Sequence, residues 1–231
     1  MHASINLKKE EIKIFSMKKK NLEVKKERKI ERELLGILAF LAVLVIAFLI
    51  ASAYFRSLNS FEYNGLTFSK QKLGEIQLFH HTYYVKTSSG QLAKYNFYVR
   101  NDPRENNVSI SGKSNLLSAG SVAYLSVNSD GLQQCRYGPL ALGSISSFMS
   151  DNQMKVVAGN LDFWQAGVRR DLWATCENKP GNRVIEILKG NETKVTIKGN
   201  CYRIEVANCE ILEATEKLEL QSLIDARKVS I

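Results

Sequence analysis

The stretch LLGILAFLAVLVIAFLIASAYF, from Leu34 to Phe55, decides how the whole chain is organised. It contains no charged side chain. At about 1.5 Å of rise per residue, some 20 helical residues cross the roughly 30 Å hydrocarbon layer of a bilayer. Helices that are apolar on all sides at this length are rare in soluble proteins. The sequence therefore predicts one transmembrane helix over residues 34–55, with the lipid bilayer as its first partner.

The charges on either side of this segment predict its orientation. Residues 1–33 contain nine Lys and two Arg against six Glu, a net charge of +5. On the other side, Arg56 is followed by no further cation until Lys70. Because Lys and Arg are enriched on the cytoplasmic flanks of membrane helices, we expect a basic cytoplasmic leader over residues 1–33. The C-terminal part is then extracytoplasmic, and the protein is a single-pass, signal-anchored protein of the cell membrane.

Two features of the N-terminal region leave alternatives open. Ala51-Ser52-Ala53 matches the small-x-small pattern of a signal-peptide cleavage site, so cleavage after Ala53 competes with a permanent anchor. The chain from Met17 onward already forms a complete basic leader, so residues 1–16 are the part that a mistaken gene start would explain. The interspersed Lys and Glu of the leader are typical of a solvated segment on anionic lipid, and they do not indicate nucleic-acid binding.

A tether over residues 56–62 leads into residues 63–231, a length that suffices for one domain with its own core. Lys189-Gly190-Asn191 separates two apolar runs and predicts a hairpin turn. The expected fold class is α+β, with a mixed, mostly antiparallel sheet, about two helices and one parallel crossover near residues 122–158. Runs rich in Val, Ile, Tyr and Phe predict strands at 63–68, 76–86, 94–100, 122–128, 155–157, 172–175, 183–188, 194–197 and 202–206.

Each of the two helices has a start signal and an apolar stripe. Pro139 suits a first helical position, and Asn208 is a candidate N-cap for the second helix. Leu220, Leu223 and Ile224 lie outside the second stripe, which predicts a bend or a second covered side. The stripes are Leu142, Ile145 and Met149 in the first helix and Ile211, Ala214, Thr215 and Leu218 in the second.

All four cysteines, Cys135, Cys176, Cys201 and Cys209, lie on the predicted extracytoplasmic side. An even number in an exported domain favours two disulfides, and four cysteines allow three pairings. The pairs Cys201–Cys209 and Cys176–Cys201 are both compatible with the predicted elements, and the spacing does not choose between them. The chain has no C-x-x-C pair, so neither a zinc site nor a redox dithiol is predicted.

Asn107 and Asn191 each begin an N-x-Ser/Thr sequon, Asn107-Val108-Ser109 and Asn191-Glu192-Thr193. Export would make both asparagines candidates for glycosylation, and both fall in predicted loops or turns.

The motifs that point to catalysis are incomplete. Gly112-Lys113-Ser114 lacks the first glycine of a phosphate-binding loop. His80 and His81 are adjacent in a predicted strand, so their side chains point to opposite faces and cannot serve one site. Acidic residues such as Asp162, Asp171 and Glu186 form no recognisable pair in the sequence. Catalytic residues are therefore unknown, and no cofactor or metal is predicted.

Aromatic residues gather between Phe79 and Tyr98 and at Trp164 and Trp173. Packing in the core is the expected use of both groups. The alternative is that some of these rings lie outside, because exposed aromatic strips can mark binding surfaces.

Four segments resemble a family of archaeal single-pass membrane proteins with a cysteine-containing extracytoplasmic domain. They are CRYGPLALGSISSF (Cys135–Phe148), TCEN (Thr175–Asn178), GNETKVTIKGNCY (Gly190–Tyr202) and CEILEATEKLEL (Cys209–Leu220). The resemblance covers about the last hundred residues. It implies an envelope location and structural cysteines, and it implies no activity and no catalytic residue.

Three functions are compatible with these observations. The first is a membrane-anchored binding or structural protein of the cell envelope, which contacts envelope components or other membrane proteins. The second is a membrane-tethered extracytoplasmic hydrolase, which would need a cleft with convergent polar groups. The third is an accessory subunit of a membrane complex, for which Ala47 and Ala51 offer a weak helix-packing signal.

Overall fold

The computed structural model describes residues 34–55, 57, 59–87, 90–117 and 120–229, and the basic leader lies outside these residues. The chain divides into two compact units, one up to Leu58 and one from Asn59 onward. The first unit contains the continuous 22-residue helix Leu34–Phe55, whose large apolar side chains are exposed. This helix is long and apolar enough to cross a membrane.

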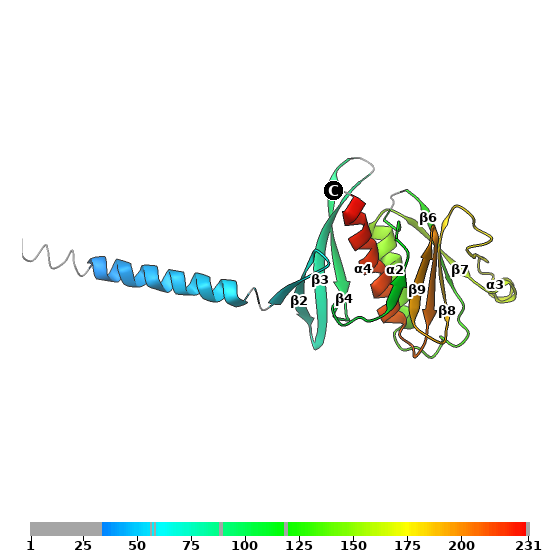
Figure 1. The fold of residues 1–231 in the computed structure, drawn as a ribbon, viewed down its shortest axis with the longest axis horizontal. Coiled ribbons are helices and arrows are strands. Elements are labelled where there is room, and N and C mark those ends of the chain that lie inside the picture. The colour runs from blue at the N-terminus through cyan, green and yellow to red at the C-terminus, as the bar shows by residue number, and fades with distance from the viewer. Residues whose placement is uncertain (1–33, 56, 58, 88–89, 118–119, 230–231) are drawn as a thin grey trace, which may run out of the picture. The chain divides into compact units, whose positions relative to one another are not determined.

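The second unit begins with a four-stranded antiparallel sheet (Figure 1). Asn64 and Gly65 both have positive φ, 48° and 81°, as a two-residue hairpin turn requires. The single strand predicted over residues 63–68 is therefore wrong, because this turn divides it. The first strand also starts inside the segment predicted as a tether. In sheet order, the strands are β1 (Ser60–Tyr63), β2 (Leu66–Leu73), β3 (Ile76–Lys86) and β4 (Leu92–Val99).

A second sheet of six strands is mixed, with the order β5-β9-β10-β8-β6-β7. Only β9 and β10 are antiparallel, and the other neighbours are parallel. The hairpin predicted at residues 189–191 is wrong, because β10 lies between β8 and β9. The strand predicted over residues 172–175 is reduced to one bridge between Trp173 and Asn160. The strands are β5 (Ser109–Ser111), β6 (Val122–Val127), β7 (Lys155–Asn160), β8 (Arg183–Lys189), β9 (Lys194–Lys198) and β10 (Cys201–Val206).

Two helices, α2 (Gly138–Asp151) and α4 (Ile211–Val229), lie between the two sheets (Figure 1). α2 connects the parallel strands β6 and β7, which confirms the predicted crossover. Phe148 of α2 packs on Phe97 of β4, with ring centroids 5.7 Å apart. α4 contacts β9 and β10 on its other side. The expected α+β class is therefore correct, but the domain has two sheets instead of one and a third helix, described below.

The position of α4 between two layers explains its composition. Leu218 of the predicted stripe is fully buried, and so are Leu220, Leu223 and Ile224 outside it, at 3–5% exposure. This confirms the prediction of a second covered side. Asn208 does not cap the helix, because it lies in a turn with φ of 51° and α4 begins only at Ile211.

Two disulfides cross-link the domain, as the even cysteine count predicts. Cys135 pairs with Cys209, which joins the segment before α2 to the segment before α4. Cys176 pairs with Cys201 at the start of β10. Of the two pairs compatible with the sequence, Cys176–Cys201 is therefore correct and Cys201–Cys209 is wrong.

Candidate docking surface

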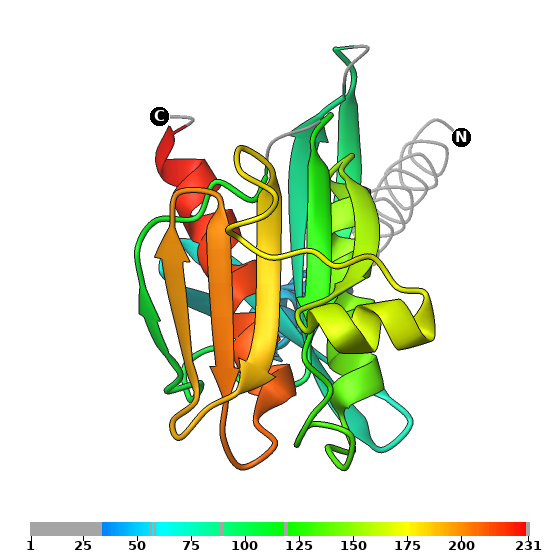
Figure 2. The ribbon, with the colours of Figure 1, turned by 90° about the vertical axis from the view of Figure 1, so that its right-hand side faces the viewer.

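A short helix, α3 (Phe163–Arg169), follows β7 on the side of the second sheet that faces away from α2 and α4 (Figures 1 and 2). Asp162 is its N-cap, and the Asp162 carboxylate accepts a hydrogen bond of 2.9 Å from the Gln165 backbone N–H. Arg170 ends the helix in the left-handed conformation, with φ of 58°. Asp162, an acidic candidate from the sequence, thus has a structural role.

Five large apolar side chains are exposed on and beside this helix, and we call them the α3 patch. The exposed fractions are 57% for Phe163, 80% for Trp164, 85% for Val168, 40% for Leu172 and 40% for Trp173. The expectation that both tryptophans pack in the core is therefore wrong. Ala166 is the only buried residue of α3.

Four of the five patch residues, all except Leu172, line an open groove of about 480 Å³. Phe163 contacts Trp173 edge to face at 5.1 Å between ring centroids, and Trp164 at 5.8 Å. The Phe163 ring thus holds the two tryptophans around one apolar surface. Contiguous exposed patches of this kind are uncommon on monomeric proteins and mark interaction sites.

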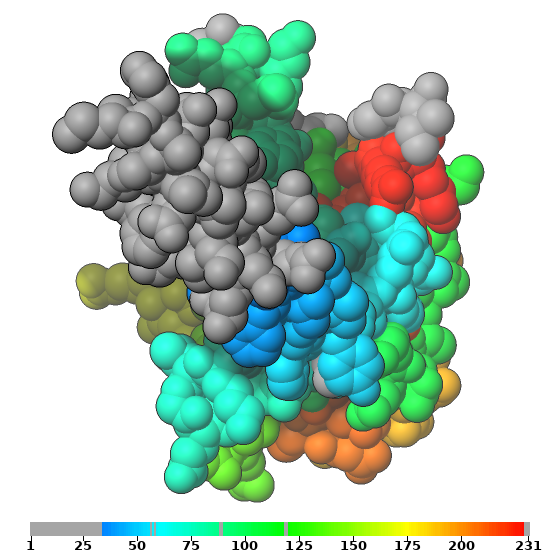
Figure 3. All heavy atoms as spheres, turned by 90° about the vertical axis from the view of Figure 1, so that its left-hand side faces the viewer, coloured from blue at the N-terminus to red at the C-terminus, as the bar shows by residue number. Residues whose placement is uncertain are grey.

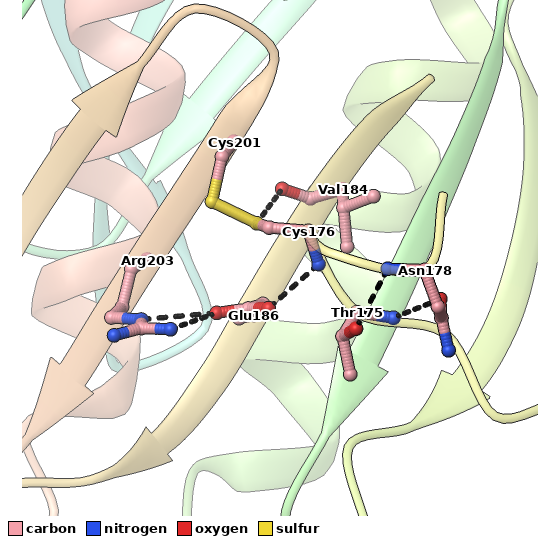
Figure 4. Close-up of a disulfide and its surroundings, with 7 residues drawn as sticks. All are labelled: Thr175, Cys176, Asn178, Val184, Glu186, Cys201 and Arg203. Atoms are coloured by element: carbon pink, nitrogen blue, oxygen red, sulfur yellow. Dashed lines mark hydrogen bonds and ion pairs between the residues drawn. A yellow bond between two sulfur atoms is a disulfide. The ribbon is translucent and has the colours of Figure 1, made fainter. Parts of the chain in front are cut away.

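The segment that follows Leu172 and Trp173 is cross-linked to β10 of the second sheet by the Cys176–Cys201 disulfide (Figure 4). Next to it, the Cys176 N–H donates to Glu186 Oε1 at 2.8 Å. Glu186 is buried in β8, and its other oxygen accepts two hydrogen bonds from Arg203 of β10, at 3.0 and 2.9 Å. Charge-assisted contacts of this type satisfy a buried carboxylate and fix its position.

Two further contacts hold the loop and the helix in place. Asn178 and Thr175 exchange two hydrogen bonds, 2.8 Å from the Thr175 N–H to Asn178 Oδ1 and 3.1 Å from the Asn178 N–H to Thr175 Oγ1 (Figure 4). Gln165 of α3 donates to Asp130 at 2.9 Å. The exposed aromatic side chains are therefore presented by a fixed scaffold and not by a loose loop.

Cys176, Glu186 and Cys201 bring possible metal-binding atoms within 4.8 Å of one another. Both sulfur atoms are joined in a disulfide, however, and thiolates are the form that binds metals. The donor set of this cluster does not suit a metal ion.

The charges around the α3 patch are balanced. Arg169 and Arg170 are exposed at the end of the helix, and Asp171 follows them directly. Together with Asp162, two carboxylates offset two guanidinium groups within residues 162–171. The patch therefore has aromatic character without a net positive field.

The two histidines lie on opposite faces of β3, as predicted. His80 is on the outer face, where Gln71 Nε2 at 3.0 Å and Ser69 Oγ at 3.4 Å approach its Nδ1 and Asn96 Oδ1 lies 3.0 Å from its Nε2. Gln71 donates to Nδ1 at the shorter distance, so this nitrogen is not free to take a proton from Ser69. The cluster is a polar network on a flat strand and not an activated serine.

The two sequons lie at one surface cavity of about 590 Å³, which both Asn107 and Asn191 line with exposed side chains. The Thr193 hydroxyl of the second sequon donates to the Ala207 carbonyl at 3.1 Å and accepts from the Ala207 N–H at 2.9 Å. The structure thus brings together two candidate sites that are far apart in the sequence, and their glycosylation stays a prediction.

The α3 patch was missed because FWQAGVR reads equally well as a buried segment. The signal that distinguishes the two is the run of charged residues Arg169-Arg170-Asp171 directly after it, which keeps this end of the helix in water. Comparison of the chain with protein-family models, with curated proteins and with solved structures finds no match.

Proposed function

We propose that this chain is a membrane-anchored, extracytoplasmic binding protein of the cell envelope, and that it binds another protein through the α3 patch. The leader over residues 1–33 would lie in the cytoplasm and the domain outside. Three features support this proposal: the apolar helix Leu34–Phe55, the cation-rich flank before it, and the two disulfides, which form in oxidising compartments. The resemblance to archaeal single-pass membrane proteins agrees with the same location.

The observation that carries the binding role is the exposure of Trp164 and Val168, at 80% and 85%, on a helix whose surroundings are fixed. Water contact of large apolar groups costs about 25 cal/mol for each Å² that a partner would cover. A fixed aromatic surface also loses little conformational entropy on binding, and Trp is enriched among residues that dominate protein interfaces.

The balanced charge favours a protein partner over the bilayer surface. Attraction to anionic lipid needs a local excess of Lys and Arg, whereas Asp162 and Asp171 offset Arg169 and Arg170 here. If the partner is itself a membrane protein, the chain acts as an accessory subunit of that complex.

The test is photo-crosslinking in intact cells, with a photoreactive amino acid in place of Val168. The matched control places it at Leu92, which is 73% exposed on β4. We expect a discrete protein adduct from position 168 that is absent from position 92 and is lost when Trp164→Ser is added. Since Trp164 is exposed, this substitution should change the free energy of unfolding by less than about 0.5 kcal/mol. Equal labelling from both positions, or an adduct unaffected by Trp164→Ser, would refute the proposal.

A further inference from the structure

A second cavity, of about 560 Å³, lies between the first sheet and the C-terminal end of α4. The space-filling view shows the red end of α4 beside the cyan and teal residues of this sheet (Figure 3). Four aliphatic side chains line its walls: Leu66, Val85, Leu117 and Leu223. Its volume is in the range of pockets that bind small molecules.

The cavity exists because β2 separates from β3. The pairing of the two strands ends at Ser69 and His80, and β3 continues to Lys86 beside β4 alone. Beyond this point a side chain replaces the backbone pairing: His81 Nδ1–H donates a hydrogen bond of 2.9 Å to the Thr67 carbonyl of β2. Burial lowers the pKa of His81, so its imidazole is neutral at pH 7 and adds no charge to the cavity.

Two cationic residues, Lys86 and Arg227, line this cavity, and no Asp or Glu is among the described residues that line it. Within the described part of the chain, no carboxylate forms an ion pair with Arg227. The cavity at the sequons has the opposite character, since five acidic residues and no Lys or Arg are among the described residues that line it. The positive sign is therefore a property of this particular cavity.

The guanidinium of Arg227 lies against the backbone of the hairpin turn before β2. Gly65 has φ of 81°, and a Cβ at this position would collide with Nη1 of Arg227. The glycine thus serves the turn and also leaves room for the guanidinium beside the backbone.

A hydroxyl group lies on the wall between these elements. Tyr83 Oη accepts a hydrogen bond of 2.8 Å from Asn152 Nδ2, and the same amide donates to the Phe148 carbonyl at 2.7 Å. Burial raises the pKa of Tyr83 to about 12, so the phenol keeps its proton at neutral pH. Because Tyr83 accepts from Asn152, its own O–H is left to donate to another group.

We propose that this cavity binds an amphipathic anion, with a carboxylate or phosphate head on Arg227 and an apolar body against Leu66, Val85, Leu117 and Leu223. A guanidinium matches both head groups in geometry and charge. The proposal is independent of the α3 patch, which uses other residues.

The experiment uses the full chain in nanodiscs of zwitterionic lipid and ligand-observed NMR, with empty nanodiscs as the blank. The probe is 4-phenylbutyrate, compared with its uncharged amide and with inorganic phosphate, which lacks an apolar body. We expect saturable binding of 4-phenylbutyrate and at least about tenfold weaker binding of both comparison molecules, since each lacks one half of the recognition. Equal binding of the acid and the amide, or no saturable binding of the acid, would overturn the proposal.

Arg227→Gln should weaken 4-phenylbutyrate binding by about tenfold or more, the loss expected for one charge-assisted hydrogen bond. Lys228→Gln is the matched control, because Lys228 is the exposed neighbour and does not line the cavity. Arg227 is also exposed, so both variants should keep the wild-type melting temperature. If the two variants bind equally well, Arg227 does not hold the head group and the proposal fails. Nanodiscs of anionic lipid distinguish the source of the natural ligand. A lipid head group in the cavity would suppress probe binding more in the wild type than in Arg227→Gln, whereas repulsion of the probe by the anionic surface acts on both alike.

Discussion

At the scale of single residues, two glutamates of α4 are buried where the helix faces α2 and β4. Glu219 is fully buried; its Oε2 accepts from the Ser144 hydroxyl at 3.3 Å, and its Oε1 has no hydrogen-bond partner. Burial, and secondarily the neighbouring carboxylate of Glu216, raise the pKa of Glu219 well above its usual range. Burial also raises the pKa of Glu216, to about 7, although the N–H groups of Arg100 and Asn101 partly offset the shift.

A carboxyl group whose pKa is raised by folding makes its largest contribution to stability at acidic pH. Below pH 4.5, Glu219 is protonated in both the folded and the unfolded chain, and its contribution to stability is complete. As the pH rises above 4.5, the unfolded chain loses the proton first. The contribution of Glu219 to the free energy of unfolding then falls by about 1.4 kcal/mol per pH unit until its folded pKa is reached.

We therefore expect Glu219→Gln to stabilise the protein at pH 8 relative to the wild type, because glutamine has a similar shape and no charge to suppress. At pH 4.5 the difference should be close to zero. Chemical denaturation at the two pH values measures this, and Glu75→Gln, in the exposed turn before β3, is the control that should change neither value. A Glu219→Gln protein that is less stable than the wild type at pH 8 would show that the carboxylate is charged in the folded state.

At the scale of elements, sequence patterns predict those strands and helices whose signals are local. β3 has the predicted bounds because residues 76–86 are rich in β-branched and aromatic side chains and a Gly precedes them. Pro139 lies in the first turn of α2, as its second residue and not as its first. By contrast, Asn64-Gly65 is a strong hairpin signal, but the apolar residues on both sides of it are also typical of one continuous strand.

Pairing between elements is the part that no local signal contains. The order β9-β10-β8 places two strands that are sequential in the chain on either side of a third. The choice between Cys201–Cys209 and Cys176–Cys201 depends on the same arrangement, since the second pair joins β10 to the loop before β8. The covered second side of α4 is an intermediate case: Leu223 and Ile224 signal that something covers it, but not that a second sheet does.

The two disulfides should differ in what their removal does. The loop-closure entropy of the unfolded chain predicts that the Cys176–Cys201 disulfide, with a separation of 25 residues, stabilises the fold by about 3.5 kcal/mol. The same relation gives about 4.4 kcal/mol for the 74 residues between Cys135 and Cys209. We expect Cys→Ser substitution of both members of a pair to reduce the free energy of unfolding more for Cys135–Cys209 than for Cys176–Cys201. Only loss of Cys176–Cys201 should also free the loop with Leu172 and Trp173, and limited proteolysis between residues 170 and 182 detects this.

Alkylation is the control for that comparison. Without a reductant, none of the four cysteines of the unfolded wild-type chain should react, because each is paired. Labelling of all four would reject the disulfides in the natural protein, and equal proteolysis of the two variants would reject a specific role for Cys176–Cys201 in holding the α3 patch.

At the scale of the whole molecule, both candidate sites depend on residues that are distant in the sequence. The proposed anion cavity combines Gly65, His81 and Arg227, and the helix–sheet packing alone brings these together. Their isolated signals, a turn glycine, a strand histidine and a basic residue near a helix end, are individually common. The sequence therefore predicts where the domain is located. It does not predict the two candidate sites, because these depend on how the two sheets pack around α2 and α4.

The proposed orientation makes a prediction for labelling with a membrane-impermeant maleimide. The native cysteines are paired and unreactive, so single introduced cysteines report their own location. Glu75→Cys lies in the exposed turn between β2 and β3, and Lys20→Cys lies in the basic leader. If the leader is cytoplasmic and the domain extracytoplasmic, Glu75→Cys should react in intact cells. Lys20→Cys should react only after the membrane is permeabilised.

The same pair of variants distinguishes an anchor from a cleaved signal. A permanent anchor keeps the labelled Glu75→Cys protein in the membrane fraction at full mass, because the 22 apolar residues from Leu34 to Phe55 remain attached. Cleavage after Ala53 would instead release it at the mass of residues 54–231. Labelling of Lys20→Cys but not Glu75→Cys in intact cells would show the opposite orientation of the chain in the membrane. It would place the α3 patch and the anion cavity in the cytoplasm, where disulfides are rare, and so would contradict the proposed extracytoplasmic binding role.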